Sequence, residues 1–354
     1  MKMLFLPRFG QQGASSRMRS YQYQPLFEAA GIECSVSPLF ADGMLLNKYK
    51  DGGYSLFALL SAYWQRCRAL TGARQFSLVW IEKEALPWWP TWFEKWMLRD
   101  VPYVLDFDDA IFHNYDLHPS PWIRRFYGRR IDRLMAGARL VVAGNRYLAD
   151  RAKAAGAARV EVIPTVVDLA RYLPKTDFSN AGVPRIVWIG SPSTAQYLLE
   201  LAEPLRALAQ RVPFVLRVIG ADALAMPGVD IEFKPWTSGT EAALIEECAI
   251  GIMPLRDSPW EQGKCAYKLI QYMACGLPTV SSPIGANLAV VVNGATGLFA
   301  ETPDAWAGQL EALLRDDALR KRLGEAGRVR VEAEFCLQQT APRMLQLLKE
   351  AGGS

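Results

Sequence analysis

The chain has 354 residues, of which 51% are hydrophobic, 21% charged and 11% aromatic, and this composition excludes a disordered or fibrous protein. Its length predicts two domains, because a domain typically has about 150 residues. The net charge of +4 is too small to indicate a nucleic-acid-binding protein.

Short apolar runs alternate with amphipathic stretches along the chain, a pattern typical of a parallel sheet with crossover helices. The strands expected in the first half are Met3–Leu6, Cys34–Pro38, Ser77–Ile81, Tyr103–Asp106, Leu140–Ala143 and Val160–Ile163. The helices expected between them include Arg17–Ala30, Ser55–Leu70, Trp122–Ala136 and Arg146–Ala155. We therefore predict a first α/β domain over residues 1–174.

A polar segment with Gly and Pro interrupts this rhythm and predicts a linker over residues 175–184. The strands expected after it are Arg185–Ile189, Phe214–Ile219, Val229–Phe233, Ile250–Met253 and Thr279–Ser281. A helix is expected near Ala266–Cys275, and two long helices near Pro303–Phe335 and Gln338–Lys349. The expected architecture is α/β, with two domains whose parallel sheets face each other across a cleft.

The six cysteines are scattered without a Cys-x-x-Cys spacing, and the only histidines are His113 and His118, which argues against a zinc site. Scattered thiols are typical of buried cysteines in a reducing compartment. The apolar run at the N-terminus is too short for a secretory signal, and no run of about 18 apolar residues predicts a membrane span. We therefore expect a cytoplasmic protein.

Two glycine-containing loops each follow the first expected strand of one half, where ligands of open α/β sheets bind. The first holds Gly10 and Gly13, and the second begins with Gly190 and Ser191. Glycine lets the backbone approach a ligand, and exposed N–H groups at a helix start favour an anion. A plain turn with serine caps is the alternative for both loops. Neither has the spacing of a dinucleotide-binding or P-loop motif, which argues against a dehydrogenase or an ordinary NTPase.

Two lysines stand four residues apart at the start of the helix expected over residues 266–275. The ammonium groups of Lys264 and Lys268, together with backbone N–H groups at the positive end of a helix, favour a diphosphate. Gln271 lies one turn further along, where it can hydrogen-bond a ribose. The alternative is two solvated lysines on a surface helix. Trp236 follows another expected strand and either covers a nucleotide base or belongs to the core.

Three stretches carry a resemblance to glycosyltransferase family 4. The run KLIQYMACGLPTVSS at residues 268–282, followed by NGATGLF at 293–299, resembles the donor-binding signature of that family. The stretch VIPTVVDLARY at 162–172 resembles the one that closes the first domain. The order and spacing of these motifs agree over nearly the whole chain.

This resemblance implies the GT-B fold, with two Rossmann-like domains. Residues 1–174 are then the acceptor-binding domain, residues 185–335 the nucleotide-sugar-binding domain, and residues 336–354 a helix that crosses back to the first domain. It also implies a retaining, hexosyltransferase-type enzyme that moves a sugar from a nucleotide-sugar donor to a glycan or lipid-linked acceptor. The expected process is surface polysaccharide biosynthesis.

The sequence departs from the family pattern at two places. Family members commonly carry two glutamates separated by seven residues, whereas Gly263 and Gln271 stand here. They also tend to have Arg and Lys in the loop that here begins with Gly190. We expect Lys264 and Lys268 to supply this positive charge, so that the nucleotide-sugar is the only co-substrate and no metal is required. A noncatalytic sugar-nucleotide-binding protein and a GT-B nucleotide-sugar epimerase remain alternatives.

Asp106, Asp108 and Asp109 crowd the end of one expected strand. Family members often have a His-Asp pair where Asp108 and Asp109 stand. Three interpretations are open. In the first, the aspartates orient substrate hydroxyls and are catalytic. In the second, Asp106 and Asp108 form a metal-binding Asp-x-Asp motif. In the third, the cluster forms salt bridges with arginines downstream. Further candidates for acceptor binding are Arg17, Glu82 and Glu84.

Aromatic and basic residues gather in one region of the first half. Trp88, Trp89, Trp92 and Trp96 fall within nine residues, and residues 122–139 carry six arginines against one aspartate. Aromatic residues beside a basic amphipathic helix suit an anionic membrane surface or a lipid-linked acceptor. The alternative is that the tryptophans are core and the arginines solvated. We therefore expect a peripheral protein at the inner face of the cell membrane and no nucleic-acid partner.

Overall fold

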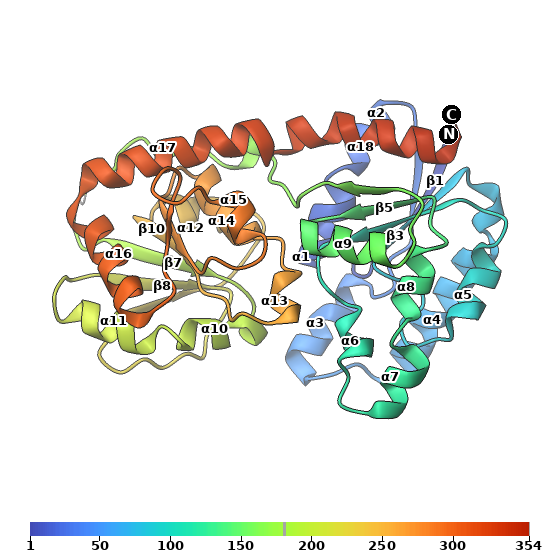
Figure 1. Ribbon diagram of the computed structural model, residues 1–354, viewed down its shortest axis with the longest axis horizontal. Helices are drawn as coiled ribbons and strands as arrows, with labels where there is room; N and C mark the ends of the chain where they lie inside the picture. Colours follow the sequence, from blue (N-terminus) through green and yellow to red (C-terminus); the bar gives the residue numbers. More distant parts are fainter. Residues whose placement is uncertain (180–181, 354) are drawn as a thin grey trace. The chain divides into compact units, whose positions relative to one another are not determined.

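The computed structural model of the chain describes residues 1–179 and 182–353. Its contacts divide the chain into two compact units. Unit 1 comprises Met1–Thr165, Gly263–Cys265 and Thr340–Ser354, and unit 2 comprises Val166–Gln262 and Ala266–Gln339. Each unit has one six-stranded parallel sheet with helices packed on it (Figure 1), so the expected α/β class with two Rossmann-like domains is confirmed.

The sheet of unit 1 has the strand order β2-β1-β3-β4-β5-β6. Its strands are β1 (Lys2–Leu6), β2 (Glu33–Val36), β3 (Leu78–Glu82), β4 (Tyr103–Phe107), β5 (Leu140–Ala143) and β6 (Val160–Val162). Every residue of β3, β4 and β5 is buried, which explains the continuous apolar runs in the sequence. The strand order reverses between β1 and β3, and ligands of such sheets bind beyond the carboxyl ends of the strands at this reversal.

The helices of unit 1 are shorter and more numerous than the sequence predicts. They are α1 (Ala14–Ser16), the π-helical turn η1 (Arg17–Tyr21), α2 (Gln24–Ala29), α3 (Asp42–Asp51), α4 (Leu56–Thr71), the 3-10 turn η2 (Ala73–Gln75), α5 (Thr91–Leu98), α6 (His113–Asp116), α7 (Pro121–Tyr127), α8 (Arg130–Met135) and α9 (Arg146–Ala154). The single helix expected over Arg17–Ala30 is wrong, because α1, η1 and α2 occupy that region. The helix expected over Trp122–Ala136 is divided near Gly128, where a Cβ would lie 2.3 Å from the Arg124 carbonyl oxygen.

The sheet of unit 2 has the order β12-β11-β10-β7-β8-β9, which is that of the doubly wound dinucleotide-binding fold when strands are counted from β7. Its strands are β7 (Arg185–Ile189), β8 (Val215–Ile219), β9 (Ile231–Lys234), β10 (Ile250–Met253), β11 (Thr279–Ser281) and β12 (Leu298–Phe299). The five expected strands are confirmed to within about two residues, and only the two-residue β12 was not predicted. The strand order reverses between β7 and β10.

The helical elements of unit 2 include two that replace one long predicted helix. They are η3 (Leu169–Arg171), η4 (Pro192–Thr194), α10 (Gln196–Leu199), α11 (Ala202–Ala209), α12 (Glu241–Glu246), α13 (Pro259–Gln262), α14 (Tyr267–Ala274), α15 (Asn287–Val290), α16 (Pro303–Arg315) and α17 (Asp317–Glu334). The expected helix Pro303–Phe335 is divided at Asp316, because the Asp316 carboxylate accepts a hydrogen bond from the Leu319 N–H and caps α17.

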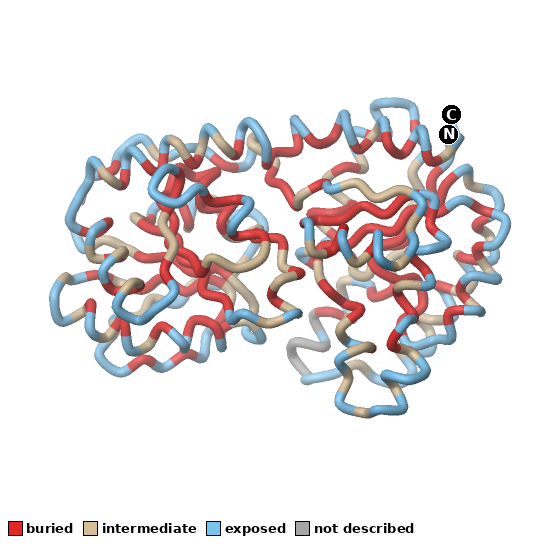
Figure 2. Tube along the Cα trace, viewed as in Figure 1, coloured by how far each residue is buried: buried red, intermediate tan, exposed pale blue. Residues whose placement is uncertain are grey.

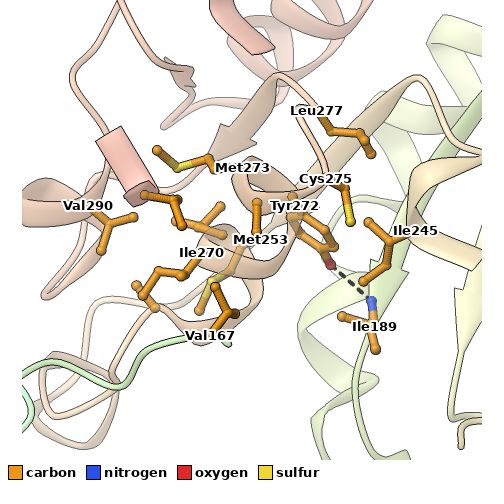
Figure 3. Close-up of a cluster of buried hydrophobic side chains, with 14 of the residues drawn as sticks. Val167, Ile189, Ile245, Met253, Ile270, Tyr272, Met273, Cys275, Leu277 and Val290 are labelled. Carbon is orange, nitrogen blue, oxygen red and sulfur yellow. Dashed lines mark hydrogen bonds between the residues drawn. The ribbon is translucent and has the colours of Figure 1, made fainter. Parts of the chain in front are cut away.

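The interiors of both units are formed by the central strands, which are buried along their lengths (Figure 2). In unit 2, α14 packs on the sheet through the cluster drawn in Figure 3. The Tyr272 hydroxyl of α14 accepts a hydrogen bond of 3.0 Å from the Ile189 N–H of β7. A Cβ on Gly251 of β10 would lie 2.3 Å from the Tyr272 ring. Only glycine at this position lets α14 lie so close to the sheet.

The segments near the expected domain boundaries are divided between the two units. Val166–Lys175 belongs to unit 2, where Val167 and Tyr172 lie in the apolar core. Within the linker expected over 175–184, residues 180 and 181 lie outside the described residues. The last helix, α18 (Leu337–Gly352), has its residues from Thr340 onward in unit 1. There the Thr340 hydroxyl lies 3.0 Å from the Tyr23 hydroxyl, within hydrogen-bond distance.

All six cysteines are free, and four of them are buried, as expected of structural thiols. Among the helices that the structure describes, none combines the length and the apolar character that crossing a bilayer requires.

Candidate functional site

Asp106 lies on β4 and is paired with a buried arginine. Arg19 of η1 donates from Nε to Asp106 Oδ2 at 2.9 Å and to Oδ1 at 3.2 Å. Both side chains are almost fully buried. Burial raises the pKa of Asp106 to about 6, although the Arg19 charge acts in the opposite direction. Asp106 therefore has an ion-pair partner, but from an upstream helical turn rather than from the downstream arginines.

Asp108 and Asp109 share a second cation, Lys83, which directly follows β3. Lys83 Nζ lies 2.8 Å from Asp108 Oδ1 and 3.5 Å from Asp109 Oδ2. Burial alone lowers the pKa of Lys83, but the two carboxylates raise it above its usual range. Burial also opposes ionisation of Asp108, yet Lys83 and a hydrogen bond donated by Ser15 lower its pKa. Lys83 and Asp108 are thus held as an ion pair.

Lys264 belongs to the same cluster, because Gly263–Cys265 groups with unit 1. Lys264 Nζ lies 3.2 Å from Asp109 Oδ1, and Asn145 Nδ2 donates to the Lys264 carbonyl oxygen at 2.9 Å. A Cβ on Gly263 would lie 2.4 Å from the Ala110 Cβ. The site where the family resemblance places its first glutamate therefore has no room for a side chain.

The two glutamates predicted to bind the acceptor have different surroundings. Glu82, at the end of β3, accepts hydrogen bonds through Oε2 from the Ser16 hydroxyl and the Arg8 N–H. Within residues 1–179 and 182–353, its buried Oε1 has no hydrogen-bond partner. Glu84 instead accepts from the Tyr115 hydroxyl at 2.8 Å and from Arg130 Nε at 3.1 Å. Glu82 thus keeps one buried oxygen without a hydrogen-bond partner among the described residues, whereas Glu84 is tied into a buried ion pair.

In the loop after β1, close packing leaves no room for a side chain at the two glycines. A Cβ on Gly10 would lie 2.3 Å from Asp42 Oδ1, and one on Gly13 would lie 2.4 Å from the Phe9 Cβ. Arg17, at the start of η1, is half-buried, and its guanidinium donates to the Gln11 carbonyl oxygen at 3.5 Å. These contacts account for both glycines without a ligand.

In unit 2, the loop after β7 lies beside Lys268. A Cβ on Gly190 would lie 2.5 Å from the Trp188 ring. Lys268 Nζ, on the first turn of α14, lies 4.4 Å from the centre of that ring. The Ser191 hydroxyl lies 2.9 Å from the Ser193 hydroxyl, which keeps the loop compact. Gly190, Ser191 and Lys268 are thus brought together around Trp188, next to the reversal of strand order.

Trp236 and Gln271 are joined through two further side chains. Trp236 Nε1 donates to Glu241 Oε2 at 2.7 Å, and the Tyr172 hydroxyl donates to Glu241 Oε1 at 3.0 Å. Gln271 Nε2 donates to the Tyr172 hydroxyl at 2.8 Å. A Cβ on Gly220 would lie 2.6 Å from the Gly190 carbonyl oxygen and 3.2 Å from the Trp236 Cβ. This network therefore lies next to the Gly190 loop.

Several residues of these two sites had no role in the sequence analysis. Among them are Arg19, Lys83, Tyr172, Trp188 and Glu241. Lys83 lies two residues after the expected strand Ser77–Ile81, between Glu82 and Glu84, and that position was a usable signal. Arg19 lay inside the helix predicted over Arg17–Ala30, and Glu241 lay beyond the strand predicted over Val229–Phe233, so neither gave a comparable signal.

The two sites suit different chemistry. A glycine loop with an ammonium group at the carboxyl end of β7 suits a phosphate, and the neighbouring indole and amide suit a nucleoside. The acidic cluster of unit 1 suits hydroxyl groups, since carboxylates accept hydrogen bonds from them. Over the described ranges 1–179 and 182–353, no three His, Cys, Asp or Glu side chains are grouped so that they could hold a metal ion.

Comparisons with curated proteins support a link to enzymes that transfer sugars. The chain is 26% identical over 200 residues to D-inositol 3-phosphate glycosyltransferase of Pseudarthrobacter chlorophenolicus, covering 49% of this chain and 46% of that protein. It is 37% identical over 71 residues to the capsular polysaccharide biosynthesis glycosyltransferase CapM of Staphylococcus aureus, covering 20% of this chain and 19% of CapM. The matches therefore span less than half the length of these curated relatives.

Solved structures share the fold over nearly the whole chain. HepE of Anabaena in complex with UDP-glucose matches with a TM-score of 0.73 and 16% identity, covering 99% of this chain and 100% of HepE. Sucrose-phosphate synthase of Thermosynechococcus elongatus matches with a TM-score of 0.72 and 16% identity, covering 99% and 98% of the two chains. These similarities establish the GT-B fold.

Two family models match consecutive parts of the chain. Residues 22–165 match the glycosyl transferase 4-like domain, and residues 183–316 match glycosyl transferases group 1. The two matches follow the order that the sequence motifs predict. The chain belongs to glycosyltransferase family 4.

Proposed function

We propose that the protein is a retaining glycosyltransferase of the hexosyltransferase type. It moves a sugar from a nucleotide diphosphate-sugar to a glycan or lipid-linked acceptor, in the biosynthesis of a surface polysaccharide. Family membership supports the transferase activity. The name of CapM supports the polysaccharide, and the complexes of HepE with UDP and UDP-glucose support the donor class.

The observation that carries this proposal is the arrangement around Trp188 in unit 2. Lys268 Nζ lies over the indole ring, next to a loop whose Gly190 permits close approach of the backbone. We assign the donor diphosphate to Lys268 and the Gly190–Ser191 backbone. We assign the nucleoside to Trp236, which donates to Glu241, and to Gln271, which donates to the Tyr172 hydroxyl. A preorganised cation stabilises the negative charge that develops as the diphosphate leaves.

We assign the acceptor to unit 1. Asp108 and Asp109 are held by Lys83, so their oxygens can orient a sugar hydroxyl without first recruiting a cation. We also assign Glu82 to the acceptor side, where its buried carboxylate holds the Arg8 N–H and the Ser16 hydroxyl. Retention of configuration follows if an oxygen of the leaving phosphate takes the acceptor proton on the same face of the donor sugar. The protein then chiefly positions the reactants and neutralises charge.

We also propose that the reaction needs no metal ion. Both oxygens of Asp106 accept hydrogen bonds from Arg19, and Asp108 pairs with Lys83 and Ser15. The Asp-x-Asp pair is therefore already neutralised by protein groups.

The test is the release of nucleotide diphosphate, measured with and without added acceptor after a thermal-shift panel has selected the nucleotide-sugar. We expect release that depends on the acceptor and that persists in EDTA. Release without acceptor would instead indicate a hydrolysing epimerase, and binding without any release a noncatalytic protein. Activity that EDTA abolishes and manganese restores would contradict the metal-independent mechanism and favour the Asp-x-Asp interpretation.

A further inference from the structure

Unit 1 exposes an unusual number of large apolar side chains on three helices and one loop. They are Leu56, Phe57, Leu60 and Trp64 of α4, Trp88 and Trp89 of the loop after β3, Trp92 and Trp96 of α5, and Trp122 and Phe126 of α7. We call these residues the aromatic surface. Scattered apolar residues on a surface are ordinary, but a large contiguous patch indicates a binding surface.

Helix α4 is apolar on its outward side. Leu56, Leu60 and Trp64 recur every four residues and are 72%, 62% and 63% exposed. The same helix buries its opposite side, where Ala62 and Leu70 are 5% and 1% exposed. A surface helix normally carries polar residues opposite its buried face. The outward side of α4 therefore has the character of a second buried face.

Ring contacts through partly buried neighbours of the aromatic surface link the three helices. Tyr63 of α4 stacks on Trp89 at a centroid distance of 6.1 Å, and Trp89 lies 5.0 Å from Phe93 of α5. Trp88 lies 6.4 Å from Tyr127 of α7. These contacts join α4, α5 and α7 through the loop after β3. Trp92 and Trp96 remain 70% and 54% exposed, which excludes the interpretation that these tryptophans are core.

Basic side chains accompany the exposed rings. The guanidinium carbon of Arg68 lies 5.8 Å from the centre of the Trp64 ring, and that of Arg99 lies 6.0 Å from the Trp96 ring. On α7, Trp122 stacks on Phe126 at 6.1 Å, with the exposed Arg124 and Arg125 between them in sequence. Tryptophan with arginine is the combination that lies at the interface between lipid headgroups and acyl chains.

We propose that the aromatic surface docks on a membrane that contains anionic phospholipid. Its rings lie at the level of the headgroups, and its arginines contact the lipid phosphates. Charge repulsion argues against a second copy of the chain on the aromatic surface. A symmetric dimer would bring the arginines of one copy close to the same arginines of the other. This proposal does not depend on the proposed enzymatic activity, since docking needs no donor or acceptor.

The test is co-sedimentation of the full chain with vesicles of phosphatidylcholine, with and without phosphatidylglycerol. We expect the protein to sediment with the vesicles that contain phosphatidylglycerol. The double variant Trp92→Ala/Trp96→Ala removes two exposed side chains and should lower the partition coefficient about tenfold or more. Arg124→Gln/Arg125→Gln should reduce the dependence on phosphatidylglycerol. Leu173→Ala/Val329→Ala, which removes exposed apolar side chains of unit 2, is the control and should bind as the unmodified protein does.

Three results would overturn the proposal. One is failure of the unmodified protein to sediment with anionic vesicles. Another is unchanged binding by the Trp92→Ala/Trp96→Ala variant. The third is a dimer in solution that this variant dissociates, measured by light scattering, because the aromatic surface would then belong to a second copy. Release of nucleotide diphosphate is measured without vesicles, so a failure here leaves the proposed enzymatic activity standing.

Discussion

Lys83 combines features that a residue rarely has without a functional reason. Its φ of 66° lies in the left-handed region, where a residue other than glycine is strained. Its ammonium group is buried between Asp108 and Asp109. The strain and the buried charge are both offset by the two carboxylates, which connects the end of β3 with the end of β4.

Removing the Lys83 charge should leave buried carboxylates without their cation. We expect Lys83→Met to lower the free energy of unfolding by about 3–5 kcal/mol, measured by urea denaturation. The double variant Lys83→Met/Asp108→Asn should recover part of this loss, because the uncompensated charge of Asp108 is then gone. Lys153→Met, on the exposed side of α9, is the control and should change stability by less than about 0.5 kcal/mol. Equal stabilities of Lys83→Met and the control would contradict the ion pair.

The acidic cluster can be recognised in the sequence, but its ion-pair partners cannot. Asp106, Asp108 and Asp109 stand out because carboxylates follow an apolar run. Lys83 reaches them only because β3 pairs with β4 in the register Glu82↔Asp106, and Arg19 only because η1 lies against the sheet. Such pairings join residues that are far apart in the chain, and a local pattern does not encode them.

Among the elements, α14 has the most direct bearing on the proposed donor site, because it carries both Lys268 and Gln271. Its position depends on Gly251, whose missing Cβ admits the Tyr272 ring. Tyr272 in turn accepts a hydrogen bond from the Ile189 N–H of β7 (Figure 3). The proposed donor site thus depends on a close contact between one helix and two strands.

A methyl group on Gly251 should force α14 away from the sheet. We expect Gly251→Ala to lower the free energy of unfolding by about 1–3 kcal/mol through overpacking, measured by chemical denaturation. Gly308→Ala is the matched control, because a Cβ on this glycine of α16 meets nothing within 4 Å. That control should be stabilised by about 0.5–1 kcal/mol. A Gly251→Ala variant as stable as the unmodified protein would show that the helix tolerates displacement.

Strand β9 is tied to β8 by a carboxylate whose titration should be visible in acid. Glu232 accepts a hydrogen bond of 2.7 Å from Arg217 Nε and lies 2.9 Å from Lys234 Nζ. Burial raises the pKa of Glu232, but these cations outweigh it and lower the pKa from 4.5 to about 2. Its contribution to stability is therefore complete above pH 4.5 and is lost as the pH falls toward 2.

We expect Glu232→Gln to cost about 1 kcal/mol of unfolding free energy at neutral pH, since solvent screens part of the interaction at this half-exposed site. The difference from the unmodified protein should shrink as the pH falls from 5 toward about 3. Urea denaturation at several pH values measures it. Glu301→Gln, at an exposed site, provides the control. A difference that stays constant with pH would contradict the lowered pKa.

Strands were more predictable than helices, and the reason is physical. Central strands such as β5 and β10 are buried at every residue, and β7 at every residue but Arg185, so their sequences are almost continuously apolar. Helices end where a side chain caps them or where packing forbids a turn. The break at Asp316 depends on a single capping carboxylate within a pattern that otherwise continues.

At the scale of the whole molecule, the two sheets provide two reversals of strand order, each with polar groups at the carboxyl ends of its strands. Lys264 and Lys268 were expected to act together, but Lys264 belongs to the acidic cluster of unit 1 and Lys268 to the Trp188 site of unit 2. Gly263 leaves no room for the glutamate that the family commonly carries. Gly263, which stands in place of the first family glutamate, therefore lies where the chain packs closely against Ala110.

Calorimetric titration with UDP or a UDP-sugar measures whether Lys268 neutralises the donor diphosphate, as we propose. We expect Lys268→Ala to weaken binding by about 1.5–3 kcal/mol, because it removes a charge-assisted hydrogen bond. The exposed Lys321→Ala on α17 should bind as the unmodified protein does. Unchanged affinity of a folded Lys268→Ala variant would contradict the claim.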